Sequence, residues 1–191
     1  MKTLIKNKTT ISNKDNLILI CNQKSNFSDF KLSKQELNYI KKEKNNAKEI
    51  ISINQYNKRV FLIFSKKEKT KNKQNEHYRL LGDTLTEKLK NEKSVLLVNL
   101  KKNENEIIQI AEGMALSNYT FTKHKTKKKP NNLSVIYLFN YSKKKKIKEL
   151  QNIVDAVFFT RDLINEPFSH LTAKDLAKSA VNSGKKYGVK T

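Results

Sequence analysis

Five short apolar runs, separated by polar segments, constrain the fold of this chain more than any other feature. They are rich in branched and aromatic side chains and occupy residues 17–21, 50–53, 59–65, 94–99 and 133–141. Runs of this length with few polar positions are typical of strands that are buried on both faces. All are far shorter than the roughly 20 residues that cross a bilayer, so we expect no membrane contact.

Amphipathic segments fill the intervals between these runs. Ser33 and Glu36 form a capping-box pattern that predicts the start of a helix. Its inward face is predicted to hold Leu37, Ile40 and Ala47. A second helix is predicted over residues 74–90, where one face recurs at helical spacing: His77, Leu80, Leu81, Leu85 and Leu89. Gly82 weakens a helix, so we expect close packing at that position.

Two further helices are predicted towards the C-terminal end. The segment 103–119 has a regular apolar face, with Asn103 or Asn105 as its cap. A longer helix follows the lysines at 143–146, and its predicted core face is Ile147, Leu150, Ile153, Val154, Val157 and Phe158. Strands that alternate with helices in this way predict an α/β fold, with a mixed or parallel sheet and helices on both faces.

The charge of the chain favours anionic partners. Its 40 basic and 18 acidic residues give a net charge of +22, and such a field attracts nucleic acid. The candidate contacts lie on either side of the last strand: Lys123, Lys125, Lys127, Lys128, Lys129, Lys143, Lys144, Lys145 and Lys146. The alternative is that these lysines are solvated loop residues and that the aromatic residues near them belong to the core.

Familiar catalytic patterns are absent from the sequence. The four glycines, Gly82, Gly113, Gly184 and Gly188, form no phosphate-binding loop. His77, His124 and His170 are widely spaced, and the only cysteine is Cys21, so no metal-ligand spacing is present. Asp162 and Glu166 are spaced four residues apart, which alone is weak evidence for acid–base chemistry. We therefore predict no catalytic and no metal-binding residue in this chain.

Two segments nevertheless carry a specific pattern. In residues 112–125, EGMALSNYTFTKHK, the pattern consists of Glu112, Gly113, Leu116, Tyr119, Phe121 and Lys125. In residues 159–177 it consists of Arg161, Asp162, Leu163, Asn165, Pro167, Leu171, Thr172, Leu176 and Ala177. Both resemble segments of the leucyl aminopeptidase (cytosol aminopeptidase, peptidase M17) family, with His124 and Ala173 as departures. The second resembles the junction between the two domains of that family, so its residues are expected to be structural.

The resemblance implies a domain organisation and a function. Residues 1–145 would form an N-terminal macro-domain-like α/β domain, 146–170 a linker helix and junction, and 171–191 the beginning of a catalytic domain. Residues 188–190 resemble the entry to that domain's first strand. Members of the family are cytoplasmic hydrolases that remove N-terminal residues from peptides, usually as hexamers, with two divalent metals such as manganese or zinc.

The metal ligands and catalytic residues of that family lie beyond position 191, so the resemblance places none of them here. The chain is expected to supply scaffold and oligomer contacts, and to be inactive alone. Two alternatives remain open at this point. One is a basic α/β module that binds nucleic acid, and the other is recognition of ADP-ribose, which the missing glycine loop disfavours.

Overall fold

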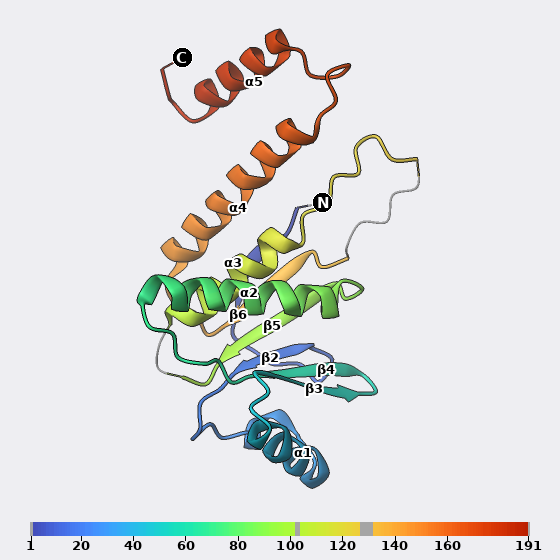
Figure 1. Cartoon of the computed structure of the whole chain (residues 1–191), viewed down its shortest axis with the longest axis vertical. Coiled ribbons are helices and arrows are strands. Elements are labelled where there is room, and N and C mark those ends of the chain that lie inside the picture. The colour runs from blue at the N-terminus through green and yellow to red at the C-terminus, as the bar shows by residue number, and fades with distance from the viewer. Residues whose placement is uncertain (1, 102–103, 127–131, 191) are drawn as a thin grey trace. The chain divides into compact units, whose positions relative to one another are not determined.

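The computed structural model describes residues 2–101, 104–126 and 132–190 (Figure 1). It divides into two compact units, Met1–Val154 and Asp155–Thr191, which are described separately. The strands are β1 (Leu4–Lys8), β2 (Leu17–Ile20), β3 (Ile50–Gln55), β4 (Lys58–Ile63), β5 (Ser94–Asn99) and β6 (Val135–Phe139). The helices are α1 (Lys34–Asn45), α2 (Lys71–Leu89), α3 (Asn105–Ser117), α4 (Lys144–Asn165) and α5 (Ala173–Lys186), with a short 3-10 turn η1 (Ser28–Phe30).

One six-stranded sheet organises the first unit. Its strand order is β1-β6-β5-β2-β4-β3, and every neighbouring pair is parallel except β3 with β4. The predicted α/β class with a mixed sheet is therefore confirmed. Strand β1 was missed because only Leu4 and Ile5 in it are apolar. Its pairing is supplied by β6, where Leu4 lies opposite Val135.

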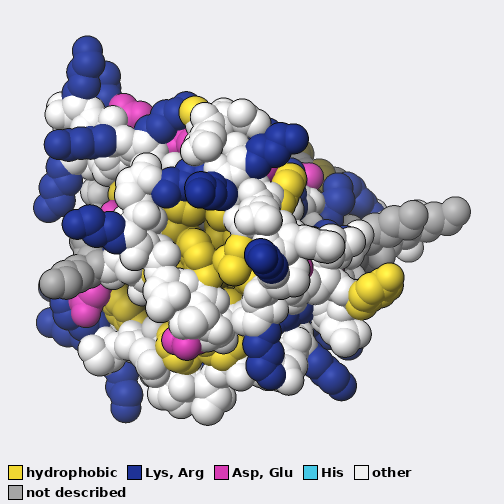
Figure 2. Space-filling model, turned by 90° about the horizontal axis from the view of Figure 1, so that it is seen from below, with side chains coloured by type: hydrophobic (Ala, Val, Ile, Leu, Met, Phe, Trp, Pro, Cys, Tyr) yellow, Lys and Arg dark blue, Asp and Glu magenta, His cyan; other side chains and the backbone are white. Residues whose placement is uncertain are grey.

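Helices cover both faces of this sheet. Helix α1 lies on one face, while α2 and α3 pack against each other on the opposite face (Figure 1). Strand β2 is central and entirely buried, as its apolar run predicts. The core on the α1 side joins Leu17 and Leu19 of β2 to Phe30 and Ile40. Apolar side chains that are only partly covered remain in view among lysines from this side (Figure 2).

Several details of the predicted helices are confirmed. Ser33 and Glu36 form the reciprocal capping box of α1. Gly82 of α2 packs directly against α3, because a Cβ atom there would meet the carbonyl oxygen of Ile110 and lie 2.9 Å from the Met114 nitrogen. The helix predicted after the lysines is α4, on which Leu150, Val154 and Phe158 are buried.

Other details are wrong, each for a local reason. Leu37, Leu80 and Ile153 are exposed, because each lies on the outer side of its helix. Ala47 lies beyond the end of α1 in left-handed backbone, with φ of 55°, so it does not extend the apolar face. Helix α3 begins after Glu104 with no side-chain cap, so Asn105 is not its cap, and Asn103 lies outside the described residues.

The second unit holds the end of α4 and the whole of α5. After Pro167 the chain turns, with the amides of His170 and Leu171 donating to the Pro167 carbonyl at 2.8 and 3.0 Å. Thr172 then forms a capping box with Asp175 at the start of α5. Residues 188–190 form no strand; Gly188 instead turns the chain at φ of 71°.

No helix in the described residues is long and apolar enough to span a membrane.

Candidate functional site at the carboxyl edge of the sheet

The topology of the first unit creates one place where connections diverge. The segment after β2 leads to α1 on one face, while the segments after β4 and β5 lead to α2 and α3 on the other (Figure 1). The neighbours β2 and β5 therefore send their chains to opposite faces. In open α/β sheets, ligands bind in the crevice outside the carboxyl ends of strands at such a switch point.

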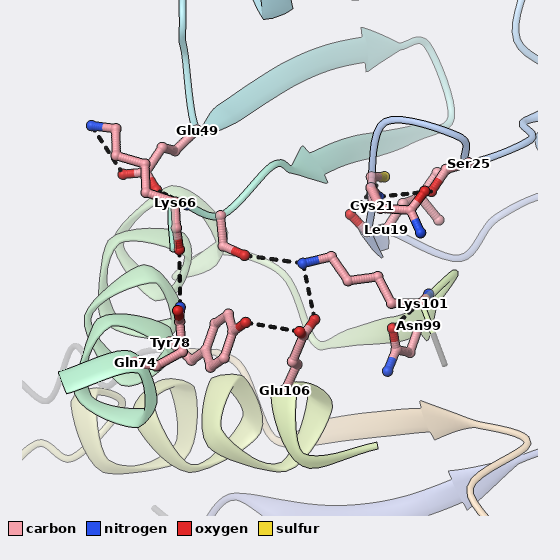
Figure 3. A network of polar contacts seen from close by, with 12 residues as sticks. Leu19, Cys21, Ser25, Glu49, Lys66, Gln74, Tyr78, Asn99, Lys101 and Glu106 are labelled. Atoms are coloured by element: carbon pink, nitrogen blue, oxygen red, sulfur yellow. Dashed lines mark hydrogen bonds and ion pairs between the residues drawn. The ribbon is translucent and has the colours of Figure 1, made fainter. Parts of the chain in front are cut away.

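A buried polar cluster lies beside this point (Figure 3). The hydroxyl of Tyr78, on α2, donates to the Glu106 carboxylate of α3 at 2.8 Å. The Lys101 ammonium, which follows β5, lies 3.1 Å from the same carboxylate and donates to the Ser65 hydroxyl at 3.0 Å. Lys101 also lies over the Tyr78 ring, 6.0 Å from its centroid. The cluster thus joins two helices to the ends of two strands.

The chemistry of this cluster favours a structural role. Burial raises the pKa of Tyr78 to about 12; the contact with Ser65 opposes this shift, and the Glu106 carboxylate adds to it. Tyr78 therefore stays a hydrogen-bond donor at neutral pH. Because Lys101 faces both a carboxylate and a hydroxyl, its charge is matched within the cluster. Glu106 is buried, and its contacts with Lys101 and Tyr78 tie α3 to the segment after β5 and to α2.

A second polar group fixes the start of α2. His77 lies 2.7 Å from a Glu49 oxygen, and that oxygen also accepts from the Lys66 amide at 2.8 Å. Burial raises the pKa of Glu49, but the hydrogen bonds from Lys66 and His77 outweigh it and leave the pKa below its usual value. Gln74 donates to the Lys66 carbonyl at 3.0 Å. His77 therefore ties α2 to the segment before β3, and the described residues place no metal ligand set around it.

A cavity of about 470 Å³ opens at the same edge. Its polar lining comes from segments that follow three strands: Asp29 after β2, Asn99, Lys101 and Glu104 from the end of β5 onward, and Asn140 and Tyr141 after β6. Its apolar lining is Ile11, Phe30, Val98, Leu100, Ile107 and Phe139. Sequence analysis missed this site. The only available signal was that several of these residues directly follow predicted strands.

The predicted lysines separate in the structure. Lys143 forms an ion pair with Glu104 at the cavity, while the next three lysines lie exposed in the first turn of α4. Lys123 and Lys125 lie in an exposed irregular segment, and Lys127, Lys128 and Lys129 fall outside the described residues. The structure therefore gathers Lys143, Lys144, Lys145 and Lys146 and does not show the remainder joining them.

The residues of the junction pattern lie in the second unit. Arg161, Asp162, Leu163 and Asn165 form the last turns of α4, Pro167 follows it, and Leu171 and Thr172 precede α5. The side-chain amide of Asn165 donates to the Arg161 carbonyl at 2.7 Å, so it holds the end of the helix. Thr172 accepts from the Asp175 amide at 3.3 Å. The two contacts lie at the end of α4 and at the start of α5.

The described part of the chain contains neither a metal site nor a reactive thiol. No group of three or more His, Cys, Asp or Glu side chains there is arranged to hold a metal ion. Cys21 is buried, and burial raises the pKa of its thiol to about 12. The thiol is therefore protonated at neutral pH and lacks the thiolate that would make it a nucleophile.

This chain resembles known proteins both in sequence and in fold. No protein-family model matches it. A protein named probable cytosol aminopeptidase from Clostridium tetani is 35% identical over 94 residues, which is 46% of this chain and 20% of that protein. One from Treponema denticola is 33% identical over 115 residues, 55% of this chain and 24% of the relative. The matched segments thus span about a fifth to a quarter of these relatives.

Solved structures show the same fold over nearly the whole chain. A mutant of tomato leucine aminopeptidase aligns with a TM-score of 0.70 and 18% identity, covering 98% of this chain and 43% of that one. The bottromycin maturation enzyme BotP in complex with Mn aligns with a TM-score of 0.67 and 13% identity, covering 92% and 37%. The fold is therefore that of the N-terminal region of leucine aminopeptidases. The relatives found by sequence are named probable cytosol aminopeptidase, which confirms the family resemblance of the two motif segments.

Proposed function

We propose that this chain is the N-terminal, non-catalytic region of a di-metal leucyl aminopeptidase. The parent protein would remove N-terminal residues from peptides in the cytoplasm and would assemble as a hexamer. The observation that carries the proposal is agreement between two independent comparisons. Sequence homologues are named cytosol aminopeptidase, and the fold aligns over 98% of the chain with less than half of a leucine aminopeptidase.

A scaffold role is supported by the second unit considered by itself. Its 37 residues, numbers 155–191, expose large apolar side chains. Ile164 and Phe168 are 76% and 80% exposed, and Tyr187 and Val189 are 69% and 61% exposed. Apolar side chains gathered on so short a segment mark a surface that packs against other protein. We propose that this surface contacts the remainder of the catalytic domain. We also propose that residues 1–145 form the macro-like domain, that 146–170 are the linker helix and junction, and that 171–191 begin the catalytic domain.

The two metals of the proposed parent do not fit this chain. A di-metal site needs several carboxylates converging on ions about 4 Å apart, and the described residues offer no such group. BotP is named as a complex with Mn, which supports manganese as the metal of the parent. Zinc is the alternative that the family resemblance implies. We place the metals and the hydrolytic step outside these 191 residues.

The purified chain is expected to release no product from a leucyl anilide in the presence of Mn²⁺ or Zn²⁺. A chimera tests the scaffold role directly. In the chimera, this chain replaces the aligned segment of the Clostridium tetani relative. Restored turnover in the chimera, compared with the same relative lacking that segment, would support the scaffold role. Turnover by the chain alone, or a chimera no more active than the deletion, would contradict the proposal.

Nucleic-acid binding is a second candidate, favoured by one observation. Four consecutive lysines, residues 143–146, lie at the amino end of α4, and no acidic residue occupies its first turn. The amino end of a helix is already positive, so cations there are unfavourable and anions are attracted. Within the described part of the chain, Lys143 is the one lysine of this run that has a carboxylate partner, which is Glu104.

Duplex DNA binding should therefore weaken steeply with salt, with a log–log slope of about −0.9 per phosphate contact. Changing Lys144, Lys145 and Lys146 to Ala should reduce that slope by roughly 2 to 3 units in fluorescence anisotropy titrations. The matched control changes Lys34, Lys41 and Lys42, exposed on α1, and removes the same charge. Equal losses in both triple variants, or no binding at about 50 mM salt, would rule out a site on α4.

A further inference from the structure

The cavity at the switch point has the dimensions and position of a ligand site. Its volume of about 470 Å³ lies within the range of roughly 300–1,000 Å³ that small-molecule sites occupy. It lies outside the carboxyl ends of β5 and β6, against the segment that follows β2. Phe30 and Phe139 contribute aromatic rings to an otherwise aliphatic lining. Shape and place therefore suit a compact organic molecule with an apolar body.

The charge around the cavity is opposite in sign to that of the chain. Lys101 is balanced by Glu106, and Glu104 is balanced by Lys143. Asp29 also lines the cavity, where its carboxylate accepts from the Ser28 hydroxyl at 3.2 Å and forms no ion pair in the described part of the chain. Among the described residues around the cavity, two neutral pairs and one carboxylate leave a charge of −1, while the whole chain carries +22. The lining therefore favours a cation over an anion.

One buried side chain of the lining has an unused hydrogen-bonding group. Tyr141 is 5% exposed, and its hydroxyl has no hydrogen-bond partner among the described residues. Burial raises the pKa of Tyr141, and the Glu104 charge raises it further. The hydroxyl is therefore neutral, and its oxygen has lone pairs that can accept from an N–H group. A buried hydroxyl without a partner destabilises a folded protein unless something else satisfies it.

We propose that this cavity binds a small organic ammonium ion that carries an apolar, preferably aromatic, body. The Asp29 carboxylate would attract the ammonium group, and the Tyr141 oxygen would accept a hydrogen bond from it. Phe30 and Phe139 would contact the apolar body and add cation–π attraction to the charge. The proposal stands on the geometry of the first unit alone and does not depend on the aminopeptidase assignment.

Three probes that share a phenylalkyl body and differ in charge test whether the cavity prefers a cation. Phenylbutylamine, phenylbutanol and phenylbutyrate would be titrated into the full chain by calorimetry and by amide chemical-shift mapping. The solution would contain about 150 mM salt, which screens the overall charge beyond roughly 8 Å. We expect the amine to bind about two- to fivefold more tightly than the alcohol, and the butyrate more weakly than both. Shifted amides should belong to residues around Phe30, Leu100 and Tyr141.

Two variants test the residues, and a third serves as control. Asp29→Asn should weaken amine binding about two- to fivefold and leave alcohol binding unchanged. Tyr141→Phe should weaken amine binding about two- to tenfold while raising the Tm of the free protein by about 2–4 °C, because it removes a buried hydroxyl without a partner. Glu149→Gln removes the same charge as Asp29→Asn from an exposed site on α4 outside the cavity and should change neither quantity.

The Tyr141→Phe result separates a binding role from a structural one, since a hydroxyl that only supported the fold would lower Tm when removed. Equal affinity for the three probes, tighter binding of the butyrate, or no binding up to millimolar concentration would overturn the proposal. So would amine binding that neither Asp29→Asn nor Tyr141→Phe weakens. The probe comparison uses the unmodified chain, so it stands even if one variant fails to fold.

Discussion

Replacing Gly113 by alanine is expected to lower the free energy of unfolding by about 3 kcal/mol or more. Gly113 lies on α3 where that helix crosses α2. A Cβ atom there would overlap the carbonyl oxygen of Arg79 and lie 2.7 Å from its Cα atom. Both are backbone atoms, so the helices must separate to admit the methyl group. Thermal unfolding followed by circular dichroism should show a Tm lower by about 6–12 °C.

The sign of this effect makes the test sharp. In an open helix, glycine to alanine stabilises by about 1 kcal/mol, so a site without the contact would show a higher Tm. Gly188→Ala adds the same methyl group where no atom lies within 4 Å, on backbone with φ of +71°. It should cost only about 1–2 kcal/mol, from the left-handed backbone. A Gly113→Ala protein as stable as the parent would disprove the close crossing of α2 and α3.

Replacing Glu106 by alanine is expected to destabilise the chain by about 3–5 kcal/mol, the usual cost of removing one partner from a buried pair. The side chains of Lys101 and Glu106 are only 16% and 8% exposed. Without Glu106, the Lys101 ammonium keeps only the Ser65 hydroxyl among the cluster members, and Tyr78 loses its acceptor. Urea unfolding at neutral pH measures the loss.

Two further variants test whether the loss of stability comes from a buried charge that has lost its partner. The double variant Lys101→Met with Glu106→Leu removes both charges and should recover most of the stability, because apolar replacements of buried pairs are often neutral or better. Glu87→Ala breaks the exposed pair with Lys90, whose atoms lie 3.5 Å apart, and should cost at most about 1 kcal/mol. If the double variant is as unstable as Glu106→Ala, the charge argument fails and the loss is one of packing.

The sequence predicted most of the fold because its strong elements are local. The apolar run at residues 94–99 coincides with β5, and the Ser33–Glu36 pair marks the start of α1. The close packing at Gly82 was likewise expected from a glycine inside a helical pattern. These features depend on residues a few positions apart, so a single sequence reveals them.

What the sequence could not show depends on long-range contacts. Glu106 has the appearance of a helix-dipole residue, and only the folded chain brings it to Tyr78 and Lys101. The cavity was missed for the same reason, because Asp29 and Tyr141 line one cavity only when β2 and β6 are in one sheet. The lysine run was seen, but its ion pair with Glu104 was not. The composition gives the positive net charge of the chain, but it does not indicate that the charge around the cavity is negative.

The edge strand β1 determines the order in which this sheet can be completed. In the described part of the chain it pairs with β6 alone, with Leu4 opposite Val135, so the pairing must close a loop of most of the first unit. Thr3 is held in the same way, by the side-chain amides of Asn118 at 2.8 Å and Gln151 at 3.2 Å. Such distant contacts form late, because the entropy of loop closure must be met first. Strand β1 therefore precedes the other five strands in this sequence but is expected to pair after them.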